Sequence, residues 1–249
     1  MSTMTTDRYS RHELLKEIGP EGQKRIAATR VFIIGAGGVG CPAALALAES
    51  GVASITIADA DAVDLTNLPR QILHTPARIG MNKAESARVA LSLVNPDVPV
   101  TPVTEYVDEA KLLELAAEAD ILIDASDNFH TRHASNRAAK KLRKVLISAS
   151  SVRYSVQLAI FDFRTGNAPC YQCTFPEDDG QDVKASATGV LAPVTSIAGM
   201  MAAEEALKIA AGLTSPSVGS LIVLDTLSWE FTRMKLAHDP NCPVCAASR

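Results

Sequence analysis

The chain has 249 residues, of which 47% are hydrophobic and 21% charged, and its formal net charge is −4. This is the composition of a globular protein with one large domain or two small ones. The chain contains no long basic run, so electrostatics give no reason to expect nucleic-acid binding. No apolar run approaches the roughly 20 residues of a membrane helix, and the N-terminus lacks the basic and apolar regions of a secretion signal. We therefore expect a cytoplasmic protein with no membrane or nucleic-acid partner.

Residues 1–29 are expected to form an N-terminal helical segment. Residues 13–28 are amphipathic, and the apolar side chains that can form one face are those of Leu14, Leu15, Ile18 and Ile26. Composition alone favours solvated surface charges for Arg8 and Arg11.

Residues 30–61 have the order strand, glycine turn, helix, strand, acid. An apolar run over residues 31–34 enters the turn Gly35-Ala36-Gly37-Gly38-Val39-Gly40, a small-residue helix follows, and a second apolar run ends at Asp59-Ala60-Asp61. Glycines at 35, 37 and 40 allow a tight turn, close approach to a phosphate and packing of helix on strand. The helix N-terminus offers free N–H groups to that phosphate, and Asp59 falls where such folds bind ribose hydroxyls. The pattern predicts a nucleotide site, with an ordinary glycine turn in an α/β domain as the alternative.

The polar residues beyond this unit distinguish between nucleotides. Asn67, Arg70 and Gln71 follow the second strand, Lys83 comes next, and Asp127-Asn128 follow a later apolar run. Glycine amides, two or three cations and a free carboxylate suit a triphosphate with Mg²⁺ better than a dinucleotide.

From residue 82 to residue 148 the sequence alternates between helix and strand. Helices are predicted over residues 82–94, 108–119 and 131–143, with Asn82 and Asp108 as N-caps of the first two, and strands over 99–103, 121–125 and 145–148. Repeated β-α-β units predict a Rossmann-like, doubly wound, mostly parallel sheet with its site at the carboxyl edge. We assign residues 30–149 to this nucleotide-binding part.

Residues 150–249 are expected to form a smaller antiparallel and helical part, continuous with the rest in one domain. Strands are predicted over residues 152–163, 221–225 and 229–236, and a helix over 196–211. The polar loop over residues 176–188 is rich in acids, so we expect it to be mobile and to act as a lid.

Four of the five cysteines form two C-x-x-C pairs, Cys170/Cys173 and Cys242/Cys245. Each pair can direct two thiolates at one tetrahedral centre, which predicts a structural zinc site. The alternatives are disulfides, which fit poorly with a cytoplasmic address, and unrelated buried thiols. Cys41 follows the glycine turn, and we expect a small core residue there rather than a nucleophile.

Together these motifs resemble the MoeB/ThiF/HesA family, the prokaryotic relatives of ubiquitin-activating enzymes. The resemblance covers essentially the whole chain and rests on residues 8–11, the glycine turn, Asp59-Ala60-Asp61, residues 67–71, Lys83, Asp127-Asn128, both cysteine pairs and Gly189-Val190-Leu191-Ala192-Pro193. It implies an ATP-dependent adenylyltransferase that activates the C-terminal carboxylate of a small ubiquitin-like sulfur carrier and releases pyrophosphate.

The resemblance also implies roles for individual residues. Asp59 would hold the ribose, Asp127 the Mg²⁺ ion, and Arg11 would reach into the neighbouring subunit's site, which implies a homodimer. The implied catalytic residues are Arg11, Arg70, Lys83 and Asp127. The implied nucleotide-binding residues are Gly35, Gly37, Gly38, Gly40, Asp59, Asp61, Asn67, Arg70, Gln71, Lys83, Asp127 and Asn128, with Asn67, Arg70 and Lys83 on the phosphates.

One position departs from the family pattern. Members that form a thioester or persulfide carry a cysteine where this sequence has Ala185, so adenylation is expected without covalent transfer. Three alternatives stay open: adenylation of a peptide or small-molecule carboxylate, a nicotinamide-dependent oxidoreductase that shares the glycine turn, and a binding module without turnover. Arg70, Lys83 and the paired cysteines argue against the oxidoreductase.

Overall fold

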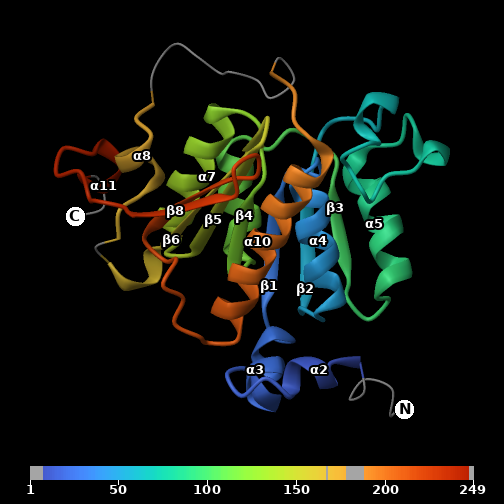
Figure 1. Ribbon diagram of the computed structural model, residues 1–249, viewed down its shortest axis with the longest axis horizontal. Helices are drawn as coiled ribbons and strands as arrows, with labels where there is room; N and C mark the ends of the chain where they lie inside the picture. Colours follow the sequence, from blue (N-terminus) through green and yellow to red (C-terminus); the bar gives the residue numbers. More distant parts are fainter. Residues whose placement is uncertain (1–7, 167, 178–187, 247–249) are drawn as a thin grey trace.

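The computed structural model describes residues 8–166, 168–177 and 188–246 (Figure 1). Eight strands form one sheet in the order β3-β2-β1-β4-β5-β6-β7-β8. The first five are parallel: β1 Arg30–Ile34, β2 Ser54–Ala58, β3 Val100–Val103, β4 Ile121–Asp124 and β5 Val145–Val152. The antiparallel strands are β6 Ser155–Asp162, β7 Ser220–Asp225 and β8 Glu230–Lys235. The predicted Rossmann-like, mostly parallel sheet with an antiparallel extension is confirmed.

The helices follow the predicted alternation. Their bounds are α2 Ser10–Glu13, α3 Gly19–Ile26, α4 Gly40–Glu49, α5 Lys83–Val94, α6 Glu109–Ala117, α7 Phe129–Lys141, α8 Tyr171–Thr174, α10 Ala192–Ala210 and α11 Pro243–Ala246. Asn82 and Asp108 accept hydrogen bonds from the first turns of α5 and α6, as predicted. Helix α10 begins four residues before the predicted start, because Pro193 lies in its first turn, where a missing N–H costs nothing.

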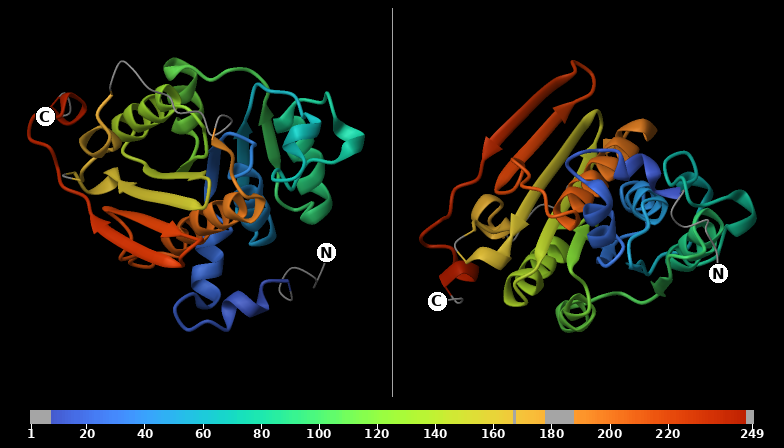
Figure 2. Two further views of the ribbon diagram at one scale, coloured as in Figure 1. Left: turned by 45° about the horizontal axis from the view of Figure 1, so that its top comes forward. Right: turned by 90° about the horizontal axis from the view of Figure 1, so that it is seen from below.

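Alternate residues of the parallel strands contribute to two cores on opposite faces of the sheet. On one face, Val31 and Ile33 of β1 pack with α4, α5 and α10; on the other, Phe32 and Ile34 pack with α6, α7 and the cysteine segments. Figure 2 shows the β7–β8 hairpin at the end of the sheet, away from α4 and α5. Burial on both faces explains why residues 31–34 of β1 and residues 121–123 of β4 are continuous apolar runs.

The N-terminal segment differs from the prediction. Ile26 is fully buried and joins the core, but Leu14 and Leu15 are 70% and 51% exposed, so the predicted apolar face of four residues is wrong. Helix α2 ends at Glu13, and Leu14 and Leu15 fall in the turn that leads to α3, outside any continuous helical face.

The division of the chain at residue 149 stays a prediction, and β5 runs across it. Among the described residues, no helix combines the length and the apolar character that a membrane crossing requires.

Candidate functional site

The glycine turn joins β1 to α4 and is shaped by steric limits at two positions. Gly35 has φ +101°, and a Cβ there would lie 2.8 Å from the Ala125 carbonyl oxygen. A Cβ on Gly40 would lie 1.8 Å from the Gly35 carbonyl oxygen. Both positions therefore require glycine. A Cβ on Gly37 would meet nothing closer than the Gln71 side-chain nitrogen at 3.8 Å, so this part of the turn has open space beside it.

Asp59 follows β2 and connects the turn to the next loop. Its Oδ2 accepts the Ala36 N–H at 2.8 Å, and its Oδ1 accepts the Asp61 N–H at 2.9 Å. Burial raises the pKa of the Asp59 carboxyl above its ordinary value, whereas Lys83 and the two N–H donors act in the opposite direction. Each carboxylate oxygen keeps a lone pair that a hydroxyl group can use.

Lys83 and Asp61 form an ion pair at this edge. The Lys83 ammonium lies 2.8 Å from Asp61 Oδ2, and the two side chains are 9% and 74% exposed. The lysine is therefore held in a buried position, while its partner carboxylate faces solvent, so that another anion can replace Asp61 beside the ammonium group.

The segment over residues 65–71 uses its polar groups to hold its own shape. Asn67 accepts the Asp64 N–H at 3.3 Å in a capping box, and the Arg70 guanidinium donates to the Thr66 carbonyl at 2.9 Å. Gln71 is buried, and its Oε1 has no hydrogen-bond partner in the described part of the chain. Gln71 lies beside the turn, and the contacts of Asn67 and Arg70 with phosphates stay predictions.

The loop after β4 carries the predicted magnesium ligand. Asp127 is exposed, and Asn128 caps α7 by accepting the Thr131 N–H at 2.8 Å. The loop is fixed from two sides: Asp124 accepts from the Ser126 N–H and hydroxyl, and Arg132 donates to the Ser126 carbonyl at 2.8 Å. Burial raises the pKa of the Asp124 carboxyl. A carboxylate on a fixed, solvent-facing loop is suited to a divalent cation.

The ends of β1, β2 and β4 thus bring the glycine turn, Asp59 and the loop with Asp127 to one edge of the sheet. Arg11 lies elsewhere, because α2 and α3 are at the opposite end of the sheet (Figure 1). Ala185 and most of the loop over residues 176–188 lie outside the described residues.

Two residues that support this edge were not predicted. His74 lies 3.0 Å from the Ala36 carbonyl oxygen, and Arg132 holds the loop after β4. Each contacts the backbone of a distant or adjoining loop through its side chain, and no local spacing in the sequence indicates such a contact.

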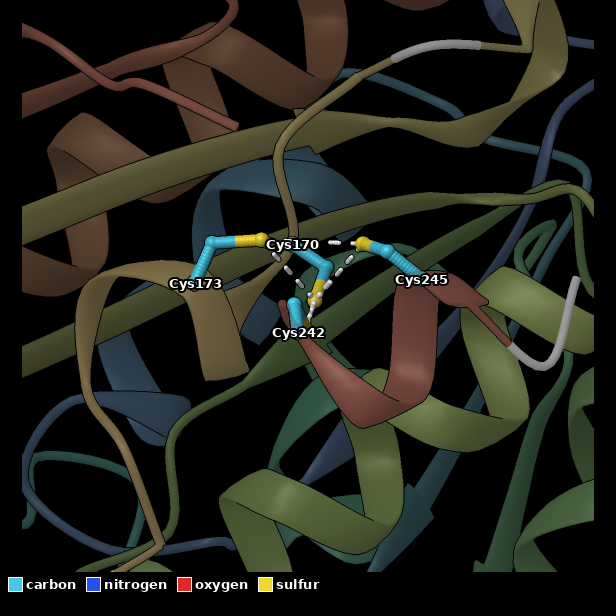
Figure 3. A group of neighbouring side chains, drawn as sticks. All are labelled: Cys170, Cys173, Cys242 and Cys245. Carbon is cyan, nitrogen blue, oxygen red and sulfur yellow. Dashed lines mark hydrogen bonds between the residues drawn. The ribbon is translucent and has the colours of Figure 1, made fainter. Parts of the chain in front are cut away.

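The four paired cysteines form one cluster (Figure 3). Sulfur–sulfur distances are 3.5 Å for Cys170–Cys245, 3.6 Å for Cys173–Cys245, 3.7 Å for Cys170–Cys242 and 3.8 Å for Cys170–Cys173. A tetrahedral centre with metal–sulfur bonds of about 2.3 Å requires edges of about 3.8 Å. The five cysteines are free thiols, so the disulfide alternative is wrong, and the cluster is compatible with zinc.

Cys41 is fully buried at the start of α4, as expected of a core residue. Burial raises the pKa of its thiol to about 12, and the S–H donates to the Ala36 carbonyl oxygen at 3.2 Å. A buried thiol that stays protonated is a poor nucleophile.

Comparison with known proteins identifies the family. The model of the ThiF family matches residues 9–244. The chain belongs to the ThiF family. It is 38% identical over 241 residues to the molybdopterin-synthase adenylyltransferase of Escherichia coli K12, covering 96% of this chain and 95% of that protein. It is 37% identical over 241 residues to the SAMP-activating enzyme E1 of Haloferax volcanii, covering 96% and 88%.

A solved structure of the microcin C7 biosynthetic enzyme MccB with N-formylated MccA aligns with a TM-score of 0.85 at 25% identity, covering 98% of this chain and 77% of that one. This ThiF-family chain is an adenylyltransferase of the MoeB/ThiF type, and enzymes of this type use ATP. The relatives give no support to the oxidoreductase alternative.

Proposed function

We propose that this ThiF-family enzyme uses Mg²⁺-ATP to convert the C-terminal carboxylate of a small ubiquitin-like sulfur-carrier protein into an acyl-adenylate. One observation carries the proposal. The glycine turn, Asp59, the Lys83–Asp61 pair and the Asp127 loop meet at one edge of the sheet. The names of the relatives from Escherichia coli and Haloferax volcanii are consistent with a substrate of this class.

The reaction requires positioning and positive charge. A substrate carboxylate oxygen attacks the α-phosphorus of ATP, a new P–O bond forms, the bond to the bridging oxygen breaks, and pyrophosphate leaves with the electron pair. Asp59 would accept the ribose hydroxyls, and Asn67, Arg70 and Lys83 would contact the phosphates. Lys83 would exchange Asp61 for a phosphate oxygen, which its buried position and exposed partner favour. Mg²⁺ held by Asp127 would neutralise charge on the phosphates.

The acyl-adenylate itself would be the product. The family's thioester position is Ala185 in this sequence, and Cys41 is a buried thiol that is protonated at neutral pH. An external nucleophile would then attack the activated carbonyl and displace AMP.

The β7–β8 hairpin fits a folded protein substrate better than a small metabolite. Every residue of the edge strand β8 is exposed, and Trp229 and Phe231 are 71% and 60% exposed. An edge strand offers unpaired N–H and C=O groups to a strand of a partner. We propose that the sulfur carrier docks on this hairpin.

We further propose a homodimer in which Arg11 completes the partner's site. Arg11 is exposed and lies at the end of the sheet opposite its own chain's nucleotide edge. An Arg11→Ala chain and a Lys83→Ala chain should each be inactive alone, and mixing them should restore part of the activity. If activity never returns in mixtures that form heterodimers, the proposed role of Arg11 in the partner's site is wrong.

We propose that the cysteine cluster holds structural zinc. The four thiolates would bind the ion and tie residues 242–245 to residues 170–173. The cluster would stabilise the fold and take no part in the chemistry.

A pyrophosphate-exchange assay tests the proposed function. Labelled pyrophosphate should enter ATP only when Mg²⁺ and a sulfur carrier with a free C-terminal carboxylate are present. Exchange with free peptides or small acids, but not with the carrier, would favour the alternative substrate class. Absence of exchange with every carboxylate, combined with ATP binding, would favour a binding module.

A further inference from the structure

The carbonyl group of Ala36, in the middle of the glycine turn, faces the interior and accepts two hydrogen bonds. His74 Nε2 lies 3.0 Å from the oxygen, and Cys41 Sγ lies 3.2 Å from it. Because a carbonyl only accepts, His74 Nε2 must carry a proton. The Ser86 hydroxyl lies 2.9 Å from Nδ1 and holds the imidazole in this orientation. His74 is 6% exposed and Ser86 fully buried, so water cannot replace either group easily.

The orientation of this carbonyl fixes the next amide. In a planar trans peptide, the C=O of Ala36 and the N–H of Gly37 point in opposite directions. The Gly37 N–H therefore points away from His74. Gly37 N has no hydrogen-bond partner among the residues that the structure describes. A side chain on Gly37 would meet only Gln71, at 3.8 Å, so the space on that side is open.

The peptide group between Gly35 and Ala36 is also held by a side chain, on its N–H side. The Ala36 N–H donates to Asp59 at 2.8 Å, so two successive peptide groups of the turn are held by side chains from later segments. Without His74, the peptide between Ala36 and Gly37 could rotate and turn its oxygen toward the open side. A carbonyl oxygen repels a phosphate, whereas an N–H group binds it.

We propose that His74 is a positioning residue that presents the Gly37 N–H to the phosphates of the bound nucleotide. The inference rests on the proposed binding of ATP at this edge. It assigns to His74 no proton transfer and no contact with the substrate. Its predicted effect is specific to phosphate, because in this proposal only the phosphates of the nucleotide meet the Gly37 amide.

The experiment compares ATP with adenosine in calorimetric titrations of the full-length chain. His74→Leu removes the donor with little change in volume, and His74→Gln restores a donor near the position of Nε2. We expect His74→Leu to weaken ATP binding about 10-fold to 100-fold, the range for one hydrogen bond to a charged group. Adenosine affinity should change less than about twofold, since it has no phosphate. His74→Gln should recover most of the ATP affinity.

A purely structural role of His74 would weaken ATP and adenosine equally, and that result would overturn the proposal. Unchanged ATP binding by His74→Leu would overturn it as well. If His74→Leu does not fold, Ser86→Ala provides the test, because it removes the hydroxyl that holds the imidazole ring. Ser86→Ala should weaken ATP binding by a smaller factor and leave adenosine binding unchanged. Equal losses of affinity for both ligands would overturn the proposal. A wild-type chain that binds no ATP would instead overturn the proposed function.

Discussion

At the carboxyl edge of β1, β2 and β4, Asp59 and Lys83 are paired with other groups of the chain, whereas the four thiols of the cysteine cluster face one another. Asp59 accepts two backbone N–H groups, and Lys83 pairs with the exposed Asp61. In the cluster, burial raises the pKa of Cys170 and of Cys245, whereas the pKa of Cys173 is lowered because hydrogen bonds to its sulfur outweigh the effect of burial. Four neighbouring thiols can lose their protons together only when a cation compensates the charge.

This difference indicates how each region is used. Groups that are already paired can exchange their partners, which suits a nucleotide that binds and leaves in each reaction cycle. Thiols that require a cation suit a metal that is bound once and stays. The two regions lie on different elements, and the following predictions separate their contributions.

The largest effect is expected from loss of the cysteine cluster. Cys170→Ser should abolish zinc binding in protein purified without chelator, while Cys41→Ala should retain about one zinc per chain by metal analysis. Zinc contributes about 10–16 kcal/mol of apparent binding free energy in small finger peptides. Because the rest of the chain has a large core, loss of zinc should loosen only the C-terminal part, and limited proteolysis should cut that part faster. Loss of folding throughout the chain, or retention of zinc, would contradict this expectation.

The next largest effect is expected in the glycine turn, at a position where the backbone leaves no room for a side chain. Gly40→Ala places a Cβ 1.8 Å from the Gly35 oxygen, and we expect the free energy of unfolding to fall by about 3 kcal/mol or more. Gly37→Ala has open space, and its unfolding free energy should change by less than about 1 kcal/mol. Urea denaturation measures both. Equal destabilisation would show that the turn is not shaped by the contact at Gly40.

A substitution of Lys83 tests whether its ion pair with Asp61 is exchanged for a phosphate during the reaction. Lys83→Ala should lower kcat for pyrophosphate exchange about 10²-fold or more, by analogy with single donors in other electrostatic sites. Its control is Lys111→Ala, at an exposed ion pair, which should change kcat less than about twofold. A near-normal kcat in the Lys83→Ala enzyme would show that Lys83 is not a catalytic residue.

The smallest effect is a pH dependence of adenosine binding. Asp59 must be ionised to accept both N–H groups and ribose hydroxyls, and burial raises its pKa above 3.8. Because the folded-state pKa is raised, Asp59 contributes most to folding stability below its unfolded pKa, and this contribution is lost as the pH rises through the folded value. Adenosine affinity has the opposite trend and should decline as the pH falls toward the raised pKa. In Asp59→Asn the adenosine affinity should be weaker and independent of pH across this range. If the affinity of this variant falls with pH as it does in the wild type, another group causes the pH dependence.

The carboxyl edge of the sheet could be predicted from the sequence, because the candidate residues follow apolar runs that clearly mark where strands end. Gly35, Asp59 and Asp127 each lie at or just beyond the end of a buried strand, and parallel strands bring these ends together. The cysteine pairs were equally clear, since the C-x-x-C spacing is itself a geometric constraint.

The supporting contacts could not be predicted in this way. His74 reaches Ala36 across 38 positions of sequence, and a single histidine has no spacing that indicates a partner. Leu14 and Leu15 fit a helical face in sequence, but the helix ends before them. Contacts that depend on where loops meet are decided by the tertiary structure.

Intact-mass spectrometry during turnover tests the central claim most directly. The enzyme is mixed with Mg²⁺-ATP and a ubiquitin-like sulfur carrier that ends in glycine. We expect the carrier to gain one AMP group on its C-terminal carboxylate, removable by hydroxylamine, while the mass of the enzyme stays unchanged. An acyl adduct on the enzyme that a reducing agent removes and Cys41→Ala abolishes would contradict direct adenylation as the final step, and a carrier that never gains AMP would contradict the activity itself.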